Sequence, residues 1–159
     1  VTSEEVKVKK EVLASPLEGK VLPLSEVEDV AFSCELLGKG CAVHPTNGQV
    51  VAPCEGTVMT LFPTLHAIGI ISKDGAEVLI HLGLDTVKLD GQGFKAHIKQ
   101  GDKVKKGQLL VTVDIDYIKN EGYSLVTPIV VTNTNDYSDV VIMNTDKVKS
   151  GQDLLTLIN

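Results

Sequence analysis

The chain has 159 residues, of which 43% are hydrophobic and 23% are charged, and its net charge is −6. This length and composition indicate one globular domain, and no apolar run approaches the roughly 20 residues of a membrane-spanning helix. The acidic balance, without a basic stripe interleaved with aromatic residues, argues against nucleic acid as a partner and against direct insertion into a membrane.

Short runs of β-branched and aliphatic residues, separated by Gly, Pro and Asn, predict strands along the whole chain. In chain order these runs cover residues 18–24, 48–53, 56–62, 77–84, 107–113, 127–133, 139–143 and 153–158. Helical turns are expected near Ser25 to Asp29 and at Asp116 to Gly122, which begins with a capping Asp and ends with Gly. The predicted fold class is therefore all-β, an antiparallel β-sandwich or barrel with one or two short helical turns.

Two stretches of the chain are repeated. The segment LASPLEGKVLPL from Leu13 resembles VAPCEGTVMTL from Val51, and GDKVKKGQLLVTV from Gly101 resembles TDKVKSGQDLLTLI from Thr145. Two copies are too few for a solenoid. We therefore expect an internal duplication of the barrel-sandwich hybrid kind, in which two interlocked hairpin units share a core and are related by a pseudo-two-fold axis.

Composition also indicates where the domain begins, in which compartment it occurs and which basic side chains it can offer. Residues 1–11 are rich in Lys and Glu and are expected to form a flexible tail or linker, whereas residues 12–159 form one domain. The three cysteines lack C-x-x-C spacing, which disfavours a disulfide framework and fits the cytoplasm. All 15 basic residues are Lys, so the chain has no guanidinium group with which to clamp a phosphate.

The stretch TLHAIGIISKDGAEVLIHLGLD, residues 64–85, predicts a hairpin with an Asp-Gly tip. A two- or four-residue tip places His66 opposite Gly83, with His81 diagonally adjacent to His66 on the same face of the sheet. A three- or five-residue tip would place the two histidines on opposite faces. We expect a two- or four-residue tip, with both histidines on one face and the hydroxyl of Thr64 within reach of the ring of His66.

This register divides the other side chains of the hairpin between two faces. The core face is expected to carry Val78, Ile80, Leu82 and Leu84. The histidine face is expected to point outward and to carry Thr64, His66, Ile68 and Ile70 opposite Glu77, Leu79, His81, Gly83 and Asp85.

Two histidines on one face indicate either a metal site or proton and phosphoryl transfer. Zinc prefers three or four ligands, and Asp85 lies four residues beyond His81, roughly 13 Å along an extended strand. The motifs of zinc peptidases, serine hydrolases and P-loop nucleotide sites are absent. No metal or cofactor is required, although weak, opportunistic zinc binding by His66 and His81 is expected.

Three other functions compete with phosphoryl transfer. A zinc-binding β-sandwich protein and a regulatory binding module could both use the histidine face. The segment TDKV at residues 145–148 resembles the lysine-bearing turn of lipoyl or biotinyl carriers, but the repeat at residues 101–104 has the same Lys, which argues against a carrier role.

The stretches GCAVHPTNGQVVAPCEGTV, FPTLHAIGI, EVLIHLGLDTVKLDGQGF and GDKVKKGQ resemble the glucose-class IIA domain of the bacterial phosphoenolpyruvate-dependent sugar phosphotransferase system. The resemblance runs from about Val12 to the C-terminus. It implies a duplicated β-sandwich and a cytoplasmic phosphotransferase component. Such a component accepts a phosphoryl group from the carrier protein HPr and passes it to the IIB domain of a sugar permease. Regulatory target proteins are a further class of partner.

The resemblance also implies roles for individual residues. His81 is expected to be phosphorylated at Nε2, with its Nδ1–H held by the backbone carbonyl of Gly83. His66, oriented by Thr64, is expected to donate a hydrogen bond to the phosphoryl oxygens, and Asp85 to lie at the rim. An apolar ring that contacts HPr and IIB is expected to comprise Val30, Ala31, Phe32, Leu36, Phe62, Leu79 and Val87. Replacing Phe32 or Phe62 by Asp is expected to weaken the binding of HPr and of IIB together while leaving the fold intact.

Overall fold

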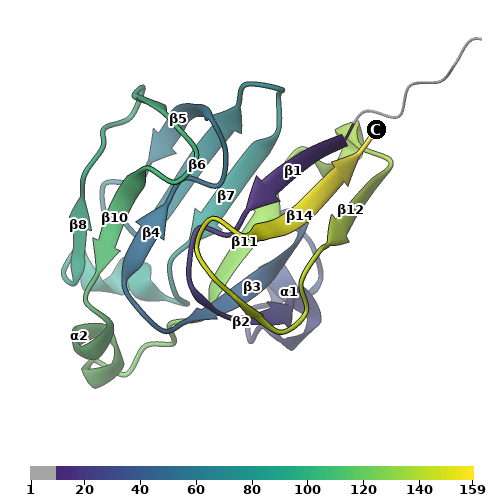
Figure 1. Ribbon diagram of the computed structural model, residues 1–159. Coiled ribbons are helices and arrows are strands. Elements are labelled where there is room, and N and C mark those ends of the chain that lie inside the picture. The colour runs from purple at the N-terminus through teal and green to yellow at the C-terminus, as the bar shows by residue number, and fades with distance from the viewer. Residues whose placement is uncertain (1–9) are drawn as a thin grey trace, which may run out of the picture.

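The computed structural model describes residues 10–159, which fold into three antiparallel sheets connected by short helices and loops (Figure 1). The strands are β1 (Lys10–Ala14), β2 (Gly19–Pro23), β3 (Lys39–Pro45), β4 (Gln49–Val51), β5 (Gly56–Leu61), β6 (Ala67–Ser72), β7 (Glu77–His81), β8 (Phe94–Ala96), β9 (Lys103–Val104), β10 (Leu109–Val113), β11 (Thr127–Val131), β12 (Asp139–Ile142), β13 (Lys147–Val148) and β14 (Asp153–Ile158). The helices are η1 (Leu24–Glu26), α1 (Val30–Ser33), η2 (Thr86–Leu89), α2 (Ile115–Asn120) and η3 (Thr134–Asp136). The predicted all-β class is confirmed.

One sheet has eight strands in the order β13-β2-β3-β11-β7-β6-β5-β9, and the other two have the orders β1-β14-β12 and β4-β10-β8. The main core contains residues from all three sheets, with Leu13, Val50 and Ile80 fully buried. In β7, buried Val78 and Ile80 alternate with partly exposed residues, as expected for a strand with one face in the core. The larger sheet therefore has its inner face fully covered.

The strand order shows the expected duplication. Strands β13-β2-β3-β11 on one side of the eight-stranded sheet correspond to β9-β5-β6-β7 on the other, and β7 pairs with β11 at the centre. The two small sheets correspond in the same way, because β1 pairs with β14 as β4 pairs with β10. The repeated sequence segments lie at equivalent strands, so the two copies are interlocked around a pseudo-two-fold axis.

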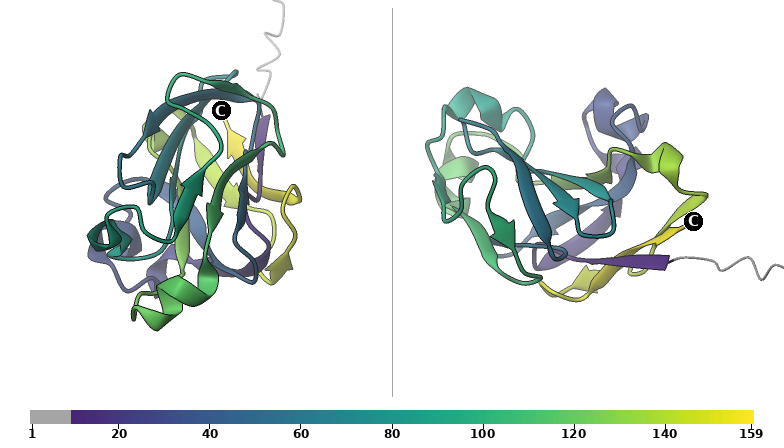
Figure 2. Two further views of the ribbon diagram at one scale, coloured as in Figure 1. Left: turned by 90° about the vertical axis from the view of Figure 1, so that its left-hand side faces the viewer. Right: turned by 90° about the horizontal axis from the view of Figure 1, so that it is seen from above.

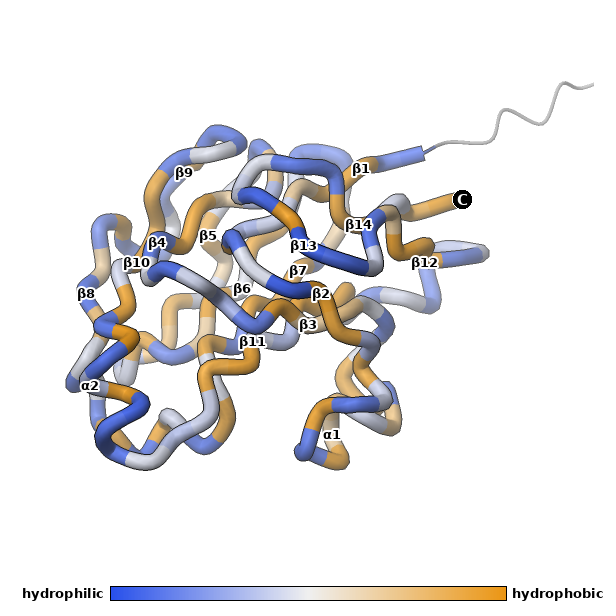
Figure 3. Tube along the Cα trace, turned by 60° about the horizontal axis from the view of Figure 1, so that its bottom comes forward, coloured by the Kyte–Doolittle hydropathy of each residue, from blue (hydrophilic) through white to orange (hydrophobic). Residues whose placement is uncertain are grey.

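A second apolar layer covers part of the outer face of the eight-stranded sheet. Leu24, Val27 and Phe32, from the segment that contains η1 and α1, pack against Ala42 and Val130 of the sheet. Viewed from above, α1 and the η2 segment stand on the side opposite the β1-β14-β12 sheet (Figure 2, right). Hydrophobic residues occur along this projecting α1 segment (Figure 3). This layer brings a distant part of the chain next to the end of β7.

Several boundaries differ from those expected. Helix α2 begins at Ile115, where the carboxylate of Asp114 accepts a hydrogen bond from the backbone N–H of Tyr117, so Asp114 and not Asp116 is the cap. The helical turn expected near residues 25–29 is present as η1, one residue earlier than expected, whereas α1, η2 and η3 were not expected. More short helices are therefore present than the sequence pattern indicated.

Strand β1 begins at Lys10, whose partner in β14 is Ile158. Residues 1–9 of the tail expected at residues 1–11 lie outside the described residues, so the division at residue 12 stays a prediction. Within residues 10–159, no helix has the length and apolar character needed to cross a membrane.

Candidate active site

His81 is the last residue of β7, and the turn that follows holds its ring. Its Nδ1 lies 2.7 Å from the carbonyl oxygen of Gly83, the hydrogen bond that the family resemblance implied. Gly83 has a φ of 83°, and a Cβ at this position would lie 2.6 Å from the carbonyl oxygen of Ser124. Only glycine fits this conformation and this space. Because a carbonyl oxygen only accepts, the proton of a neutral His81 lies on Nδ1 and the lone pair on Nε2.

His66 lies directly before β6 and follows a tight turn. The backbone N–H of Leu65 donates to the carbonyl of Phe62, and Leu65 has a φ of 59°, in the left-handed region. The hydroxyl of Thr64 lies 2.5 Å from Nδ1 of His66, so these two groups share a hydrogen bond. The turn therefore positions Thr64 and His66 together.

The hairpin register differs from the predicted one. Residues 73–75 form a three-residue loop, and the ladder pairs Ala67 with His81. The prediction that His66 faces Gly83 was therefore wrong by one residue. The loop has its glycine, Gly75, at a φ of 101°, which suits the left-handed position of a three-residue hairpin loop.

This register moves two predicted members of the histidine face into the core. Ile68 pairs with Ile80 and Ile70 with Val78, and all four side chains are buried. The two histidines nevertheless meet, because β6 begins at Ala67 and the preceding turn, rather than strand alternation, directs the side chain of His66.

The histidine rings lie in edge-to-face contact. Their centroids are 5.1 Å apart and their planes make an angle of 84°. Phe32 lies 5.1 Å from the ring of His81, and Phe62 lies 5.3 Å from the ring of His66. In the described part of the chain, neither Nε2 atom makes a hydrogen bond, and neither is among the fully buried atoms without a partner. Both Nε2 atoms therefore reach solvent.

The surroundings favour neutral imidazoles. Burial lowers the pKa of His66 below its ordinary value, and the neighbouring His81 lowers it further. Burial also lowers the pKa of His81, although the Gly83 carbonyl and the carboxylates of Asp29 and Asp85 oppose this shift. A neutral His81 keeps the lone pair on Nε2 that a nucleophile requires.

Asp29 is a site residue that sequence reasoning missed. Its carboxylate accepts a hydrogen bond of 3.0 Å from the backbone N–H of Ala31, capping α1, and its charge acts on His81. The only local signal was an Asp at the start of an apolar turn, which does not reveal proximity to β7. Asp85, which was expected at the rim, is exposed and has a φ of 60°.

The expected apolar ring is only partly a surface feature. Four of its members are well exposed: Val30 at 67%, Leu36 at 70%, Phe62 at 38% and Val87 at 48%. Ala31 and Leu79 are partly buried. Phe32 is only 2% exposed, because α1 folds its side chain into the second apolar layer beneath His81. The expectation that Phe32 is a surface residue was wrong.

Replacing Phe32 and Phe62 in turn should distinguish a residue packed in the core from one that is exposed. Phe32→Ala leaves a cavity in the second apolar layer and should lower the free energy of unfolding by about 3–5 kcal/mol. Phe62→Ala, at a half-exposed site, should lower it by less than about 1 kcal/mol. Urea denaturation of both variants measures the difference, and equal losses would contradict the assignment of Phe32 to the core.

The lowered histidine pKa values predict how stability changes with pH. The two histidines bind a proton more readily in the unfolded chain than in the folded site. Their contribution to the free energy of unfolding is therefore fully present above the ordinary pKa of 6.5. It is lost as the pH falls through the lower folded values. Urea denaturation at several pH values should show that the free energy of unfolding falls less on acidification for His66→Gln than for the wild type. His97→Gln is the exposed control. Identical slopes of the free energy of unfolding against pH for His66→Gln and the wild type would refute the prediction.

Comparison with known proteins places this geometry in a family. A family model for the EIIA 1 component of the phosphoenolpyruvate-dependent sugar phosphotransferase system matches residues 11–137. The beta-glucoside-specific EIIBCA component from Bacillus subtilis (strain 168) is 52% identical over 148 residues, which cover 93% of this chain and 24% of that protein. The glucoside-specific EIICBA component from Staphylococcus carnosus (strain TM300) is 46% identical over 148 residues, covering 93% of this chain and 21% of that protein.

The chain thus spans about a quarter of the length of these relatives. Among solved structures, the glucose permease IIA from Mycoplasma capricolum superposes with a TM-score of 0.88 at 39% sequence identity. That match covers 93% of this chain and 96% of the solved one. The chain therefore belongs to the EIIA 1 family of the phosphoenolpyruvate-dependent sugar phosphotransferase system.

Proposed function

We propose that His81 carries a phosphoryl group between two partner proteins, accepting it from HPr and passing it to the IIB domain of a sugar permease. The single observation that carries this proposal is the hydrogen bond from Nδ1 of His81 to the carbonyl of Gly83. It leaves the lone pair of Nε2 free at the surface, where a partner can present phosphorus. The relatives that combine B, C and A components support IIB as the acceptor.

Acceptance is a substitution at phosphorus. The Nε2 lone pair of His81 forms a bond to the phosphorus atom while the bond from phosphorus to the donor's nitrogen breaks, and the donor keeps that electron pair. The proton of His81 remains on Nδ1 throughout and is donated in a hydrogen bond to the Gly83 carbonyl. In delivery, a thiolate of the IIB domain attacks the phosphorus, and the electron pair of the broken bond returns to Nε2.

His66 is suited to assist both steps. When the Thr64 hydroxyl donates to Nδ1 of His66, the neutral ring carries its proton on Nε2. The edge-to-face contact places the ring of His66 beside that of His81. We assign His66 the role of donating a hydrogen bond to a phosphoryl oxygen, and Thr64 the role of positioning His66.

The charges around His81 explain why a partner must complete the site. Asp29 and Asp85 act on His81 as negative charges, and the chain contains no Arg. Transfer of a phosphoryl group requires positive charge around its oxygens. We infer that each partner brings this charge, and that the two carboxylates attract it while the exposed apolar residues exclude water.

The proposal also covers the cellular location of the domain and the binding of zinc by its two histidines. We place the domain in the cytoplasm, peripheral to the permease it serves. Among residues 10–159, no group of three or more potential metal ligands occurs. The weak zinc binding expected at His66 and His81 remains a prediction, and such an ion would need water or a partner for its remaining ligands.

The two histidines should differ sharply when replaced. His81→Gln should accept no phosphoryl group from HPr, because an amide has no nucleophilic nitrogen. His66→Gln should still accept, because the amide can donate a hydrogen bond, but delivery to IIB should slow on the order of 10²-fold. Intact mass after incubation with phosphoenolpyruvate, enzyme I and HPr measures acceptance, and loss of the label to IIB measures delivery.

His97→Gln, outside the site, is the matched control for both steps and should behave as the wild type. If His66→Gln failed to accept while His81→Gln accepted normally, the two roles would be reversed. If wild-type protein gained no phosphoryl group, the relay itself would be excluded.

The exposed apolar residues should serve both partners. Leu36→Asp places a charge on a side chain that is 70% exposed and should weaken binding of HPr and of IIB about tenfold or more without unfolding the protein. Val12→Asp, in β1 of a different sheet and 42% exposed, is the control. Calorimetric titration measures both affinities, and a loss confined to one partner would disprove a shared docking surface.

A further inference from the structure

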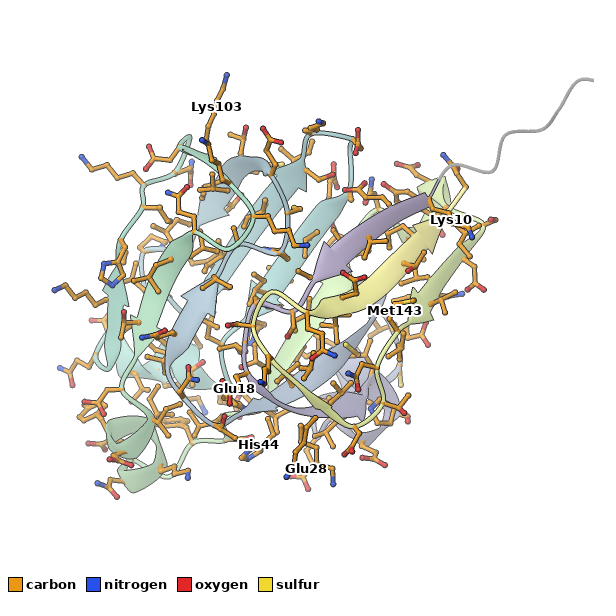
Figure 4. The ribbon with its side chains drawn as sticks, in the orientation of Figure 1. Lys10, Glu18, Glu28, His44, Lys103 and Met143 are labelled. Carbon is orange, nitrogen blue, oxygen red and sulfur yellow. The ribbon has the colours of Figure 1, made fainter. Side chains whose placement is uncertain are left out.

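A groove of about 480 Å³ lies at the edge of the eight-stranded sheet where β13 pairs with β2. Its lining contains four basic side chains, one acidic one and two neutral polar ones: Lys20, His44, Lys147, Lys149, Glu18, Thr46 and Gln152. Glu18 and His44 lie close together at the lower end of the molecule in Figure 4. Neither His66 nor His81 lines this groove, so it is separate from the relay site.

Three of the basic residues lie in one row across neighbouring strands. Lys147 of β13 is the partner of Lys20 in β2, and Lys20 is in turn the partner of His44 in β3. All three side chains are exposed. Directly opposed side chains have Cβ atoms about 4.5–5.5 Å apart, and like charges at this spacing destabilise a sheet. The row therefore concentrates positive charge where strand pairing alone would disfavour it.

The protein does not neutralise this row with its own carboxylates. In the described chain, the one ion pair within 4.0 Å is that between Lys73 and Glu55, and both of these residues line the corresponding groove in the other half of the molecule. Glu18 lines the groove, but its carboxylate lies 3.5 Å from the side-chain amide of Asn47 and forms no such pair with a lysine. Gln152 adds a donor, because its oxygen accepts from the backbone N–H of Lys149 and its NH₂ group remains.

The duplicated half of the molecule provides a natural comparison. The equivalent groove, where β9 pairs with β5, has a volume of about 510 Å³. Its row consists of Lys103, Thr57 and Ile71, so two of the three basic positions are neutral there. Lys103 marks this second groove at the opposite end of the molecule (Figure 4). Both grooves are lined by three lysines and one glutamate. They differ in arrangement, because the second groove pairs one lysine with its glutamate and has a single basic residue in its row.

We propose that the groove between β2 and β13 binds a small anion carrying two or more phosphate or carboxylate groups. Lysines bind such groups as point charges, and the imidazole of His44 can donate a hydrogen bond to them. The volume is in the range of small-molecule sites. Strand alternation places Lys20 and His44 on the sheet face that also carries His81, so the bound anion lies on the side at which partners dock.

Inorganic pyrophosphate and citrate are suitable probes of this site at low ionic strength. We expect saturable amide shifts in NMR spectra at Lys20, His44 and Lys147, and none of comparable size in the second groove. Lys20→Thr, which installs the residue of the second copy, should weaken binding about tenfold or more. Lys103→Thr is the matched control and should leave binding unchanged.

The reverse substitution tests the row directly. Thr57→Lys combined with Ile71→His should give the second groove a basic row and a second binding event, with Thr57→Lys alone as the variant if the double one does not fold. Binding of pyrophosphate only, of citrate only or of both supports the proposal and identifies the preferred group. Absence of saturable shifts with either probe, equal shifts in both grooves, or wild-type affinity in Lys20→Thr would overturn it.

Thermal unfolding gives a second readout that does not depend on NMR assignment. Lys20→Thr should raise the melting temperature of the free protein at low salt, because it removes one like-charge pair. Pyrophosphate should raise the melting temperature of the wild type and leave that of Lys20→Thr nearly unchanged. An equal rise for both proteins would contradict binding at this row.

Discussion

The hydrogen bond between Nδ1 of His81 and the carbonyl oxygen of Gly83 is the interaction on which the functional site depends. It requires a backbone with a φ of 83° and a residue without Cβ, and it fixes which nitrogen of His81 carries the proton. The hydroxyl of Thr86, which donates to the carbonyl of Leu82, holds the following turn in place. The proposed nucleophile is thus prepared by backbone geometry, without a neighbouring base to remove a proton.

The duplicated fold supplies the strand position of His81 twice and places a histidine at only one of the two. By the strand pairing, Val130 of β11 occupies the position equivalent to His81 of β7. Val130 is buried beneath the η1 and α1 segment, whereas the end of β7 remains accessible beside the same segment. Duplication therefore builds a stable frame around a shared core, and the segment between β2 and β3 decides which half carries the chemistry.

The same asymmetry separates the two charged grooves. Each copy has a β-strand edge with a lysine at its start, but only the β2–β13 copy continues that charge across the neighbouring strands. Like charges in register weaken a sheet slightly, and the large buried core makes that cost tolerable. One half of the fold therefore carries the proposed phosphoryl-transfer site, and the other carries a candidate site for anions on the same sheet face.

The sequence by itself determined the strand-rich class and the duplication, because strand periodicity and repeated turns are local signals. The family motifs implied that His66 and His81 share a site, whereas the strand-alternation argument for this rested on the wrong register. It did not determine the hairpin register, since an Asp-Gly tip fits loops of two or three residues and one residue of slip exchanges the faces of Ile68 and Ile70. Only the tertiary structure buried Phe32, brought Asp29 to His81 and aligned Lys147 with Lys20 and His44. These contacts join segments far apart in the chain, and their geometry follows from how whole sheets pack, which no short stretch of sequence specifies.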